Sequence, residues 1–213
     1  MSGSAVIKGI SQRGDSTYLV SIDVANDSGR ELVEFVLLEE LLESLSIEIG
    51  DEIAEELSLI DYNASVTAAY SSACASFAYV QSSIKALYRK LIVKGFSKEV
   101  SRDAIDIVRK RGFVDEEDIA LRRAEIMIGK LWGRSRILKK LFEEGFPGNV
   151  IEYVSESLDN VDFSENCQKA IAKKYQGIPI DRKERDKMYA FLIRLGYSSS
   201  DIRRAISQFS EKE

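Results

Sequence analysis

The chain contains no histidine among its 213 residues. Histidine is the commonest general base and a frequent zinc ligand, because its ordinary pKa lies near neutrality. Its absence excludes Ser–His and Cys–His nucleophile pairs and argues against most hydrolases and metalloenzymes. The sequence also lacks a Walker phosphate loop, a dinucleotide-binding glycine motif and a nucleophile elbow. We therefore expect a protein that is not an enzyme and that holds neither a metal nor a cofactor.

Cysteine and proline are scarce, with two residues of each. Cys74 and Cys167 are far apart and do not form a CxxC motif, so we expect both thiols to be reduced and structural. Two prolines and no low-complexity tract argue against a long disordered linker. The start does not resemble a signal peptide, and no apolar run reaches about 18 residues. These features predict a cytoplasmic protein that does not contact a membrane.

Charge is distributed unevenly along the chain. Residues 1–75 have 3 Lys and Arg against 14 Asp and Glu, a net charge of −11. Residues 76–140 have 16 against 8, a net charge of +8, and residues 141–213 have a net charge of −2. Solvated helix faces account for many such charges, but a basic middle region also suits an anionic partner.

One short phrase occurs three times at nearly constant spacing. Its glycines are 50 and then 51 residues apart. The three copies are Leu91-x-x-x-Gly95-Phe96, Leu141-x-x-x-Gly145-Phe146 and Leu192-x-x-x-Gly196-Tyr197. Each phrase is typical of a helix end, where glycine takes a left-handed conformation and the next residue folds back on the last turn. A fixed period of this size predicts stacked helical repeats, which more often bind partners than catalyse reactions.

Two kinds of periodicity predict the fold class. A small β-rich element is predicted within residues 1–60, from a short apolar run at 5–10, an alternating run at 18–24, a turn at 26–29 and a third strand candidate at 31–37, followed by a short helix at 38–45. Residues 61–82 predict a connector or first helix, followed by three-helix repeats at 83–132 and 133–182 and a truncated third repeat at 183–213. The expected fold is mostly α, with tandem three-helix repeats in an elongated curved array.

Local signals define several of the expected helices. Ser97 and Asp115 are expected to cap the helices that follow them. Cys167 is expected to be buried on a helix as a small hydrophobic residue. In the second copy of the phrase, the apolar stripe that leads to Gly145 is expected to contain Ile137, Leu138, Leu141 and Phe142.

Several segments of the chain resemble a known protein family. Residues 83–97, which end in Lys94-Gly95-Phe96-Ser97, and the following Gly112-Phe-Val-Asp115 are similar to the RecX family of recombination regulators. The resemblance continues in residues 133–146 and 191–198, and more loosely in Ile47-Glu-Ile-Gly50-Asp51-Glu52-Ile53. One departure is the segment at 79–82, where members usually have an Arg pair and this chain has Tyr-Val-Gln-Ser.

The resemblance implies a regulator of the RecA recombinase that binds RecA–DNA filaments and dampens ATP hydrolysis and strand exchange. The basic residues expected to contact this partner are Arg122, Arg123, Lys130, Arg134, Arg136, Lys139 and Lys140. The same side chains also suit a solvated helix face. We expect a monomer with at most weak contact to single- or double-stranded DNA.

Two alternatives share these features. Short helices with many Lys and Arg residues could bind nucleic acid directly, with Trp132 or Tyr88 stacked on bases. The array could instead be a scaffold for another protein. The acidic group Asp115, Glu116 and Asp118 favours helix capping over acid–base or metal chemistry, because carboxylates stabilise a helix N-terminus.

Overall fold

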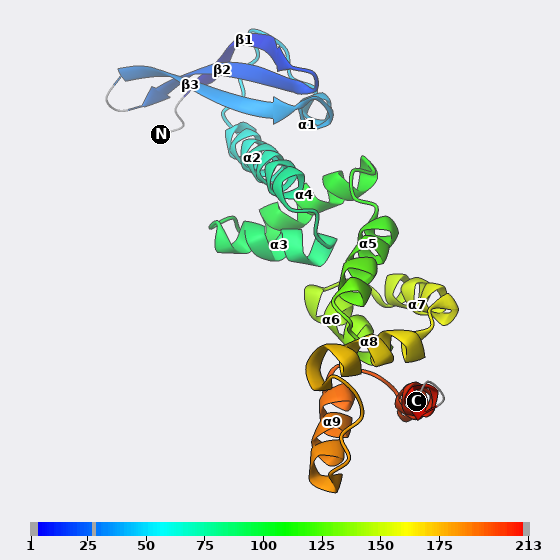
Figure 1. The fold of residues 1–213 in the computed structure, drawn as a ribbon. Coiled ribbons are helices and arrows are strands. Elements are labelled where there is room, and N and C mark those ends of the chain that lie inside the picture. The colour runs from blue at the N-terminus through cyan, green and yellow to red at the C-terminus, as the bar shows by residue number, and fades with distance from the viewer. Residues whose placement is uncertain (1–3, 27–28, 211–213) are drawn as a thin grey trace. The chain divides into compact units, whose positions relative to one another are not determined.

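The computed structural model describes residues 4–26 and 29–210, in which a three-stranded sheet precedes ten α-helices (Figure 1). The described chain divides into two compact units, Met1–Val80 with Leu87–Phe113, and Gln81–Ala86 with Val114–Glu213. The mostly helical fold with a small N-terminal sheet confirms the predicted class.

The N-terminal sheet follows from strand alternation. Strands β1 (Ala5–Gly14), β2 (Thr17–Asn26) and β3 (Gly29–Leu38) pair antiparallel in that order. Asn26 is opposite Gly29, and the other two residues of the predicted turn, 27 and 28, lie outside the described part. Because alternate side chains of a strand share a face, Ile7, Ile22 and Leu37 form one buried cluster.

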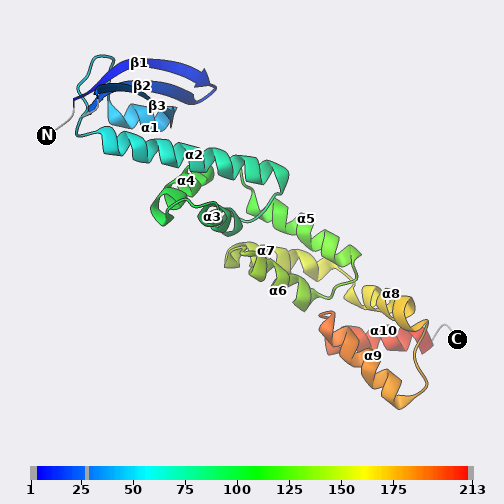
Figure 2. The same ribbon diagram turned by 90° about the vertical axis from the view of Figure 1, so that its left-hand side faces the viewer.

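Helices α1 (Glu39–Leu45) and α2 (Leu57–Tyr79) cover this buried face of the sheet (Figure 2). Ile60 of α2 is buried in the same cluster. The hydroxyl of Thr67 accepts a hydrogen bond of 3.0 Å from the amide of Leu38. Of residues 61–82, predicted as a connector or first helix, residues 61–79 belong to the 23-residue helix α2. The many small residues at 61–75 allow this helix to pack closely against the sheet and α4.

The remaining helices follow the repeated phrase. Their bounds are α3 (Ile84–Val93), α4 (Lys98–Lys110), α5 (Glu116–Gly129), α6 (Arg134–Glu144), α7 (Gly148–Ser157), α8 (Phe163–Tyr175), α9 (Arg182–Arg194) and α10 (Ser199–Ser210), with a short 3₁₀ turn at Leu158–Asn160. The predicted caps are present, since Ser97 accepts from the amide of Val100 and Asp115 from the amide of Asp118.

All three copies of the phrase end a helix in the same way. The glycines have φ values of +96°, +93° and +93° at Gly95, Gly145 and Gly196. In each copy the amide of the following aromatic residue donates to the carbonyl of the phrase's leucine, at 3.2, 3.2 and 3.3 Å. This is the Schellman arrangement, which satisfies carbonyl groups that a helix end leaves without partners. We call these three turns the helix stops.

The helices that pack together are not the same sets of three that the sequence period groups together. Helices α5, α6 and α7 pack on one another, and α8, α9 and α10 form a second group of three. In the first unit, α2 packs on α4. A period of about 50 residues sets the length of a repeat but not its first helix, which depends on where the apolar faces meet.

One predicted core residue is exposed. Ile137 and Leu141 of α6 are fully buried, whereas Phe142 of the same predicted stripe lies largely in solvent. An apolar stripe marks a helix face, but only the neighbouring helices determine how far around the helix that face is covered. Elsewhere, Met188, Leu192 and Tyr197 are buried as the repeat pattern requires.

Candidate functional site

A close backbone contact within the second unit borders the best candidate site. Gly133, which caps α6, and Gly196, the third helix stop, approach so closely that a Cβ atom on Gly133 would lie 2.2 Å from the carbonyl carbon of Gly196. The amide of Gly133 donates to the carbonyl of Leu195 at 2.7 Å. The amide of Ser135 donates to the carbonyl of Gly196 at 3.2 Å. This contact fixes the start of α6 against the end of α9.

A cleft of about 560 Å³ lies beside this contact. Its lining residues are Trp132, Ser135, Arg136, Lys139, Lys140, Glu143, Ile193, Arg194 and Gly196. We call it the basic cleft, because four cationic side chains face a single carboxylate. The excess of positive charge makes the cleft attractive to a carboxylate or phosphate group of a partner.

Arg136 and Trp132 are held together in the cleft. The guanidinium carbon of Arg136 lies 3.9 Å from the centroid of the Trp132 ring, a cation–π contact. One face of the indole is therefore covered by the guanidinium. This contact limits Arg136 to few rotamers, so its remaining donors point in a fixed direction.

The two lysines of the cleft are only weakly paired. Lys139 lies 4.0 Å from Glu143 and Lys140 lies 3.7 Å from Glu144, each one helical turn away on α6. Exposed pairs of this kind contribute about 0.3–0.5 kcal/mol. Both ammonium groups can therefore turn to a partner's anionic group at little cost.

The structure brings only three of the seven predicted contact residues into the basic cleft, namely Arg136, Lys139 and Lys140. Arg194 also lines it and was missed by the sequence analysis. Arg194 is part of the third helix-stop phrase. The repeat could have pointed to it as a cleft residue, but only with the knowledge that a helix stop contacts the start of another helix. Lys130 instead lines a separate cleft, together with Lys173 and Lys174, which were also missed.

The other three predicted residues make internal contacts. Arg122 pairs with Asp118 on its own helix. Arg123 donates to the carbonyl of Gln81 at 2.9 Å. Arg134 pairs with Asp159. It also donates to the backbone carbonyl and the hydroxyl of Ser155, at 2.8 and 2.9 Å. These residues therefore have a structural use within the unit.

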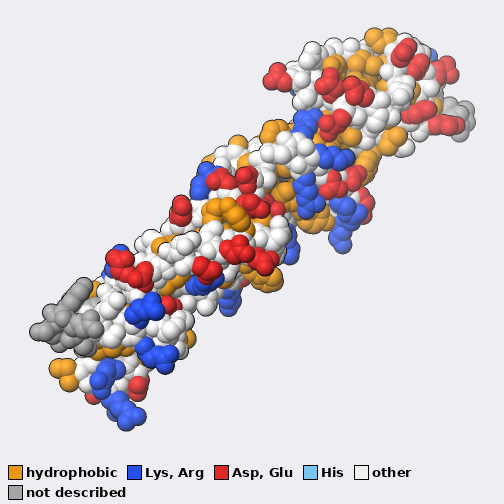
Figure 3. Space-filling view, turned by 90° about the vertical axis from the view of Figure 1, so that its right-hand side faces the viewer, with side chains coloured by type: hydrophobic (Ala, Val, Ile, Leu, Met, Phe, Trp, Pro, Cys, Tyr) orange, Lys and Arg blue, Asp and Glu red, His pale blue; other side chains and the backbone are white. Residues whose placement is uncertain are grey.

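Acidic and basic side chains are interleaved on the face shown in Figure 3, where red groups lie between the blue ones. Within residues 76–140, ion pairs along a single helix include Arg109 with Asp106 and Arg122 with Asp118. The positive net charge of residues 76–140 is thus spread over several helix faces. The basic cleft is a local concentration of positive charge.

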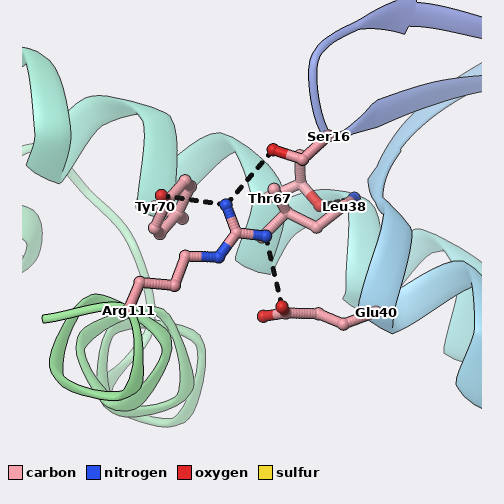
Figure 4. A network of polar contacts seen from close by, with 6 residues as sticks. All are labelled: Ser16, Leu38, Glu40, Thr67, Tyr70 and Arg111. Atoms are coloured by element: carbon pink, nitrogen blue, oxygen red, sulfur yellow. Dashed lines mark hydrogen bonds and ion pairs between the residues drawn. The ribbon is translucent and has the colours of Figure 1, made fainter.

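Arg111 joins four parts of the first unit (Figure 4). Its guanidinium donates to the hydroxyls of Ser16 and Tyr70 at 3.3 and 3.1 Å, and to the carboxylate of Glu40 at 3.2 Å. It also lies 4.9 Å from the Tyr70 ring centroid. Burial is the main cause that raises the pKa of Tyr70, so its phenol stays neutral and accepts from Arg111. Three of its five N–H donors are used inside the protein, which favours a structural role for Arg111.

Other candidate chemistry is weak. Cys74 and Cys167 are both free thiols, as predicted. Burial raises the pKa of Cys167 to about 12, which keeps it protonated and unreactive. Within residues 4–26 and 29–210, no three acidic, cysteine or histidine side chains gather as a metal site would require. In the same part of the chain, no helix is both long and apolar enough to cross a membrane.

Comparisons with known proteins agree with this architecture. The family model described as "RecX, third three-helix domain" matches residues 161–206, which contain α8, α9 and the first part of α10. The "Regulatory protein RecX" of Clostridium botulinum (strain Alaska E43 / Type E3) is 24% identical over 179 residues, covering 82% of this chain and 84% of that protein. The protein of the same name from Chlorobium phaeobacteroides (strain BS1) is 29% identical over 130 residues, covering 56% of this chain and 82% of that protein.

Solved structures share the fold. A structure described as "Crystal structure of regulatory protein RecX" has a TM-score of 0.75 at 20% identity and covers 94% of this chain and 98% of its own. RecX from Lactobacillus salivarius has a TM-score of 0.59 at 17% identity and covers 69% of this chain and 97% of its own. Residues 161–206 thus match the third three-helix domain of RecX proteins, longer segments of the chain are similar to curated proteins named as RecX regulators, and the fold is shared with solved RecX structures.

Proposed function

We propose that this chain binds the nucleoprotein filament of the RecA recombinase and restrains ATP hydrolysis and strand exchange, without catalysing a reaction itself. The similarity to proteins named as RecX regulators supports this role. The basic cleft is the observation that carries it, because it offers fixed and mobile cations to an anionic surface. We also propose that the chain acts as a monomer in the cytoplasm, where a bacterial recombinase works.

Each cation of the cleft suits a particular contact. Arg136, held over Trp132, can form two parallel hydrogen bonds with a carboxylate or phosphate. Lys139 and Arg194 are exposed at the rim and can attract the filament during encounter. Charged groups of this kind mainly raise the association rate and fix orientation, so binding should weaken as salt increases.

Direct binding to naked DNA is the weaker candidate. Base stacking requires an open aromatic face, and Arg136 covers one face of Trp132. Four cations, partly offset by Glu143, would also neutralise few phosphates. A DNA-binding module should nevertheless shift naked DNA with a steep salt dependence, which separates it from a filament regulator.

The decisive measurement is ATP hydrolysis by RecA on single-stranded DNA, with this protein titrated in. The charge reversals Lys139→Glu and Arg194→Glu together should raise the concentration for half-inhibition by about tenfold or more, which corresponds to at least ~1.4 kcal/mol. Lys169→Glu together with Lys187→Glu is the matched control, because both are exposed helical lysines with a carboxylate partner on their own helix. No inhibition by the unmodified protein would refute the proposed function. Equal effects of the cleft and control variants would refute the role of the basic cleft.

A further inference from the structure

The three helix stops have the same backbone geometry but different surroundings. Gly145 and Gly196 are buried, whereas Gly95 is exposed. The aromatic residues that follow differ in the same way, since Phe146 and Tyr197 are 4% and 3% exposed and Phe96 is only half-buried. Two stops are therefore covered by other parts of the fold, and the first is open.

The two covered stops show what fits on such a turn. The N-terminal turn of α3 lies on Gly145, where the hydroxyl of Ser83 donates to the carbonyl of Glu144 at 2.7 Å. A Cβ atom on Gly145 would lie 3.1 Å from the Cβ of Lys85. The N-terminal turn of α6 covers Gly196 in the corresponding way, as described for Gly133. In both cases the start of a helix, with a small capping residue, packs on the glycine and hydrogen-bonds to the carbonyl groups at the turn.

At the open stop, no other part of the described chain fills the space that a helix start occupies at the other two stops. Among the described residues, no atom outside its immediate neighbours would lie within 4 Å of a Cβ atom on Gly95. Val93, two positions before Gly95, is also exposed, at 86%. The ammonium group of Lys94 donates to Ser72 and Ser76 on α2 at 2.7 and 3.2 Å, which holds the residue before Gly95 against this helix.

Charge indicates which helix start would bind there. At the second stop, Lys85 packs on Gly145, which Glu143 and Glu144 precede in the sequence. The open stop has the opposite character, since Lys94 and Lys98 flank Gly95 and both are exposed. An acidic first turn is therefore the complementary occupant, and Asp and Glu also stabilise helix N-termini in general.

We infer that the open stop at Gly95 is a docking site for the N-terminal turn of a partner's helix, one with a small or polar capping residue and an acidic first turn. This inference rests on the proposed function, in which the partner is a subunit of the RecA filament. A second copy of this chain is a poorer occupant. Its acidic helix start is at α5, where the carboxylate of Glu116 already accepts a hydrogen bond of 2.9 Å from the amide of Ile84.

The substitution Gly95→Asn tests the site directly, because the added side chain would occupy the space that a docked helix start needs. Gly112→Asn is the matched control, since Gly112 also has positive φ and among the described residues meets no neighbour within 4 Å. Asparagine tolerates the left-handed conformation, so both variants should fold, as circular dichroism would verify. Affinity for RecA filaments on single-stranded DNA should fall about tenfold or more for Gly95→Asn and change by less than about twofold for Gly112→Asn.

A photo-crosslinking residue at Val93 identifies the occupant, with the same residue at Ile180, 96% exposed, as the control. The expected crosslink joins Val93 to an acidic first turn of a RecA helix. Crosslinks to DNA or to a second copy of this chain would overturn the inference, and so would equal filament binding by the two asparagine variants. In each of these cases, filament binding by the unmodified protein would leave the proposed function standing. If the unmodified protein does not bind the filament, the proposed function fails and this inference fails with it.

Discussion

Gly133→Ala should strongly destabilise the second unit, although glycine-to-alanine changes usually stabilise a protein. The backbone at Gly133, with φ of −81° and ψ of 161°, is accessible to alanine. At a site without close neighbours, the change would add about 0.4–1 kcal/mol to stability by restricting the unfolded chain. Here the new methyl group would lie 2.2–2.4 Å from three backbone atoms of Gly196 and Tyr197, which cannot rotate away as a side chain could.

The magnitude follows from what the methyl group displaces. Overpacking of a fixed contact costs about 1–3 kcal/mol. Separation of the two segments would also weaken the Gly133–Leu195 and Ser135–Gly196 hydrogen bonds, each worth about 1 kcal/mol. Tyr197, which donates to the carbonyl of Leu131 at 2.9 Å, would shift as well. Allowing for the gain in the unfolded chain, we expect a net loss of about 3 kcal/mol.

The assay is urea unfolding followed by tryptophan fluorescence, because the chain's single tryptophan, Trp132, is adjacent to Gly133. With a slope of about 2 kcal/mol per molar urea, the midpoint should fall by about 1.5 M. Gly129→Ala is the control, since Gly129 ends α5 and among the described residues has no neighbour within 4 Å of an added Cβ. That variant should be as stable as the unmodified protein or more so. Equal midpoints for the two variants would refute the close-contact argument.

Two further predictions concern polar groups. Arg111→Lys should destabilise the first unit by about 1–2 kcal/mol, because an ammonium group cannot reach Ser16, Tyr70 and Glu40 at once, and faster amide exchange in the sheet would reveal this. Unchanged exchange would contradict the bridging role. Hydrogen bonds from the Ser164 hydroxyl and then from backbone amides hold the pKa of Asp162 below its usual value near 3.8. The carboxylate therefore stabilises the fold above that value, and this contribution is lost as the pH falls through the lower folded pKa. Asp162→Asn should be less stable than the unmodified protein at neutral pH by about 1 kcal/mol or less, with a difference that closes in acid. Urea midpoints measured across the pH range would test this, and a constant difference would argue against it.

Several features could be predicted from the sequence because their causes are local. The helix stops at Gly95, Gly145 and Gly196 depend on the positive φ that glycine adopts easily. The caps at Ser97 and Asp115 depend on a side chain that accepts from an amide three residues later. Strand alternation likewise predicted the sheet.

The candidate site was only partly predictable. Arg136, Lys139 and Lys140 are on one helix, so their grouping follows from sequence spacing. Arg194 joins them from a different helix through the Gly133–Gly196 contact, which no local pattern encodes. Arg134 has the same charge and is close to them in sequence, yet it does not line the cleft. Its guanidinium pairs with Asp159 and donates to the carbonyl of Ser155.

The sequence by itself determined the helix stops, the caps at Ser97 and Asp115 and the presence of the sheet, and that the helical phrase recurs every 50 or 51 residues. Tertiary structure alone decided that Phe142 is exposed, that α8 packs with α9 and α10, and which helix stops are covered. The physical reason is that turns and caps depend on interactions within a few residues, whereas burial and charge clustering depend on which surfaces meet across about 60 residues of chain.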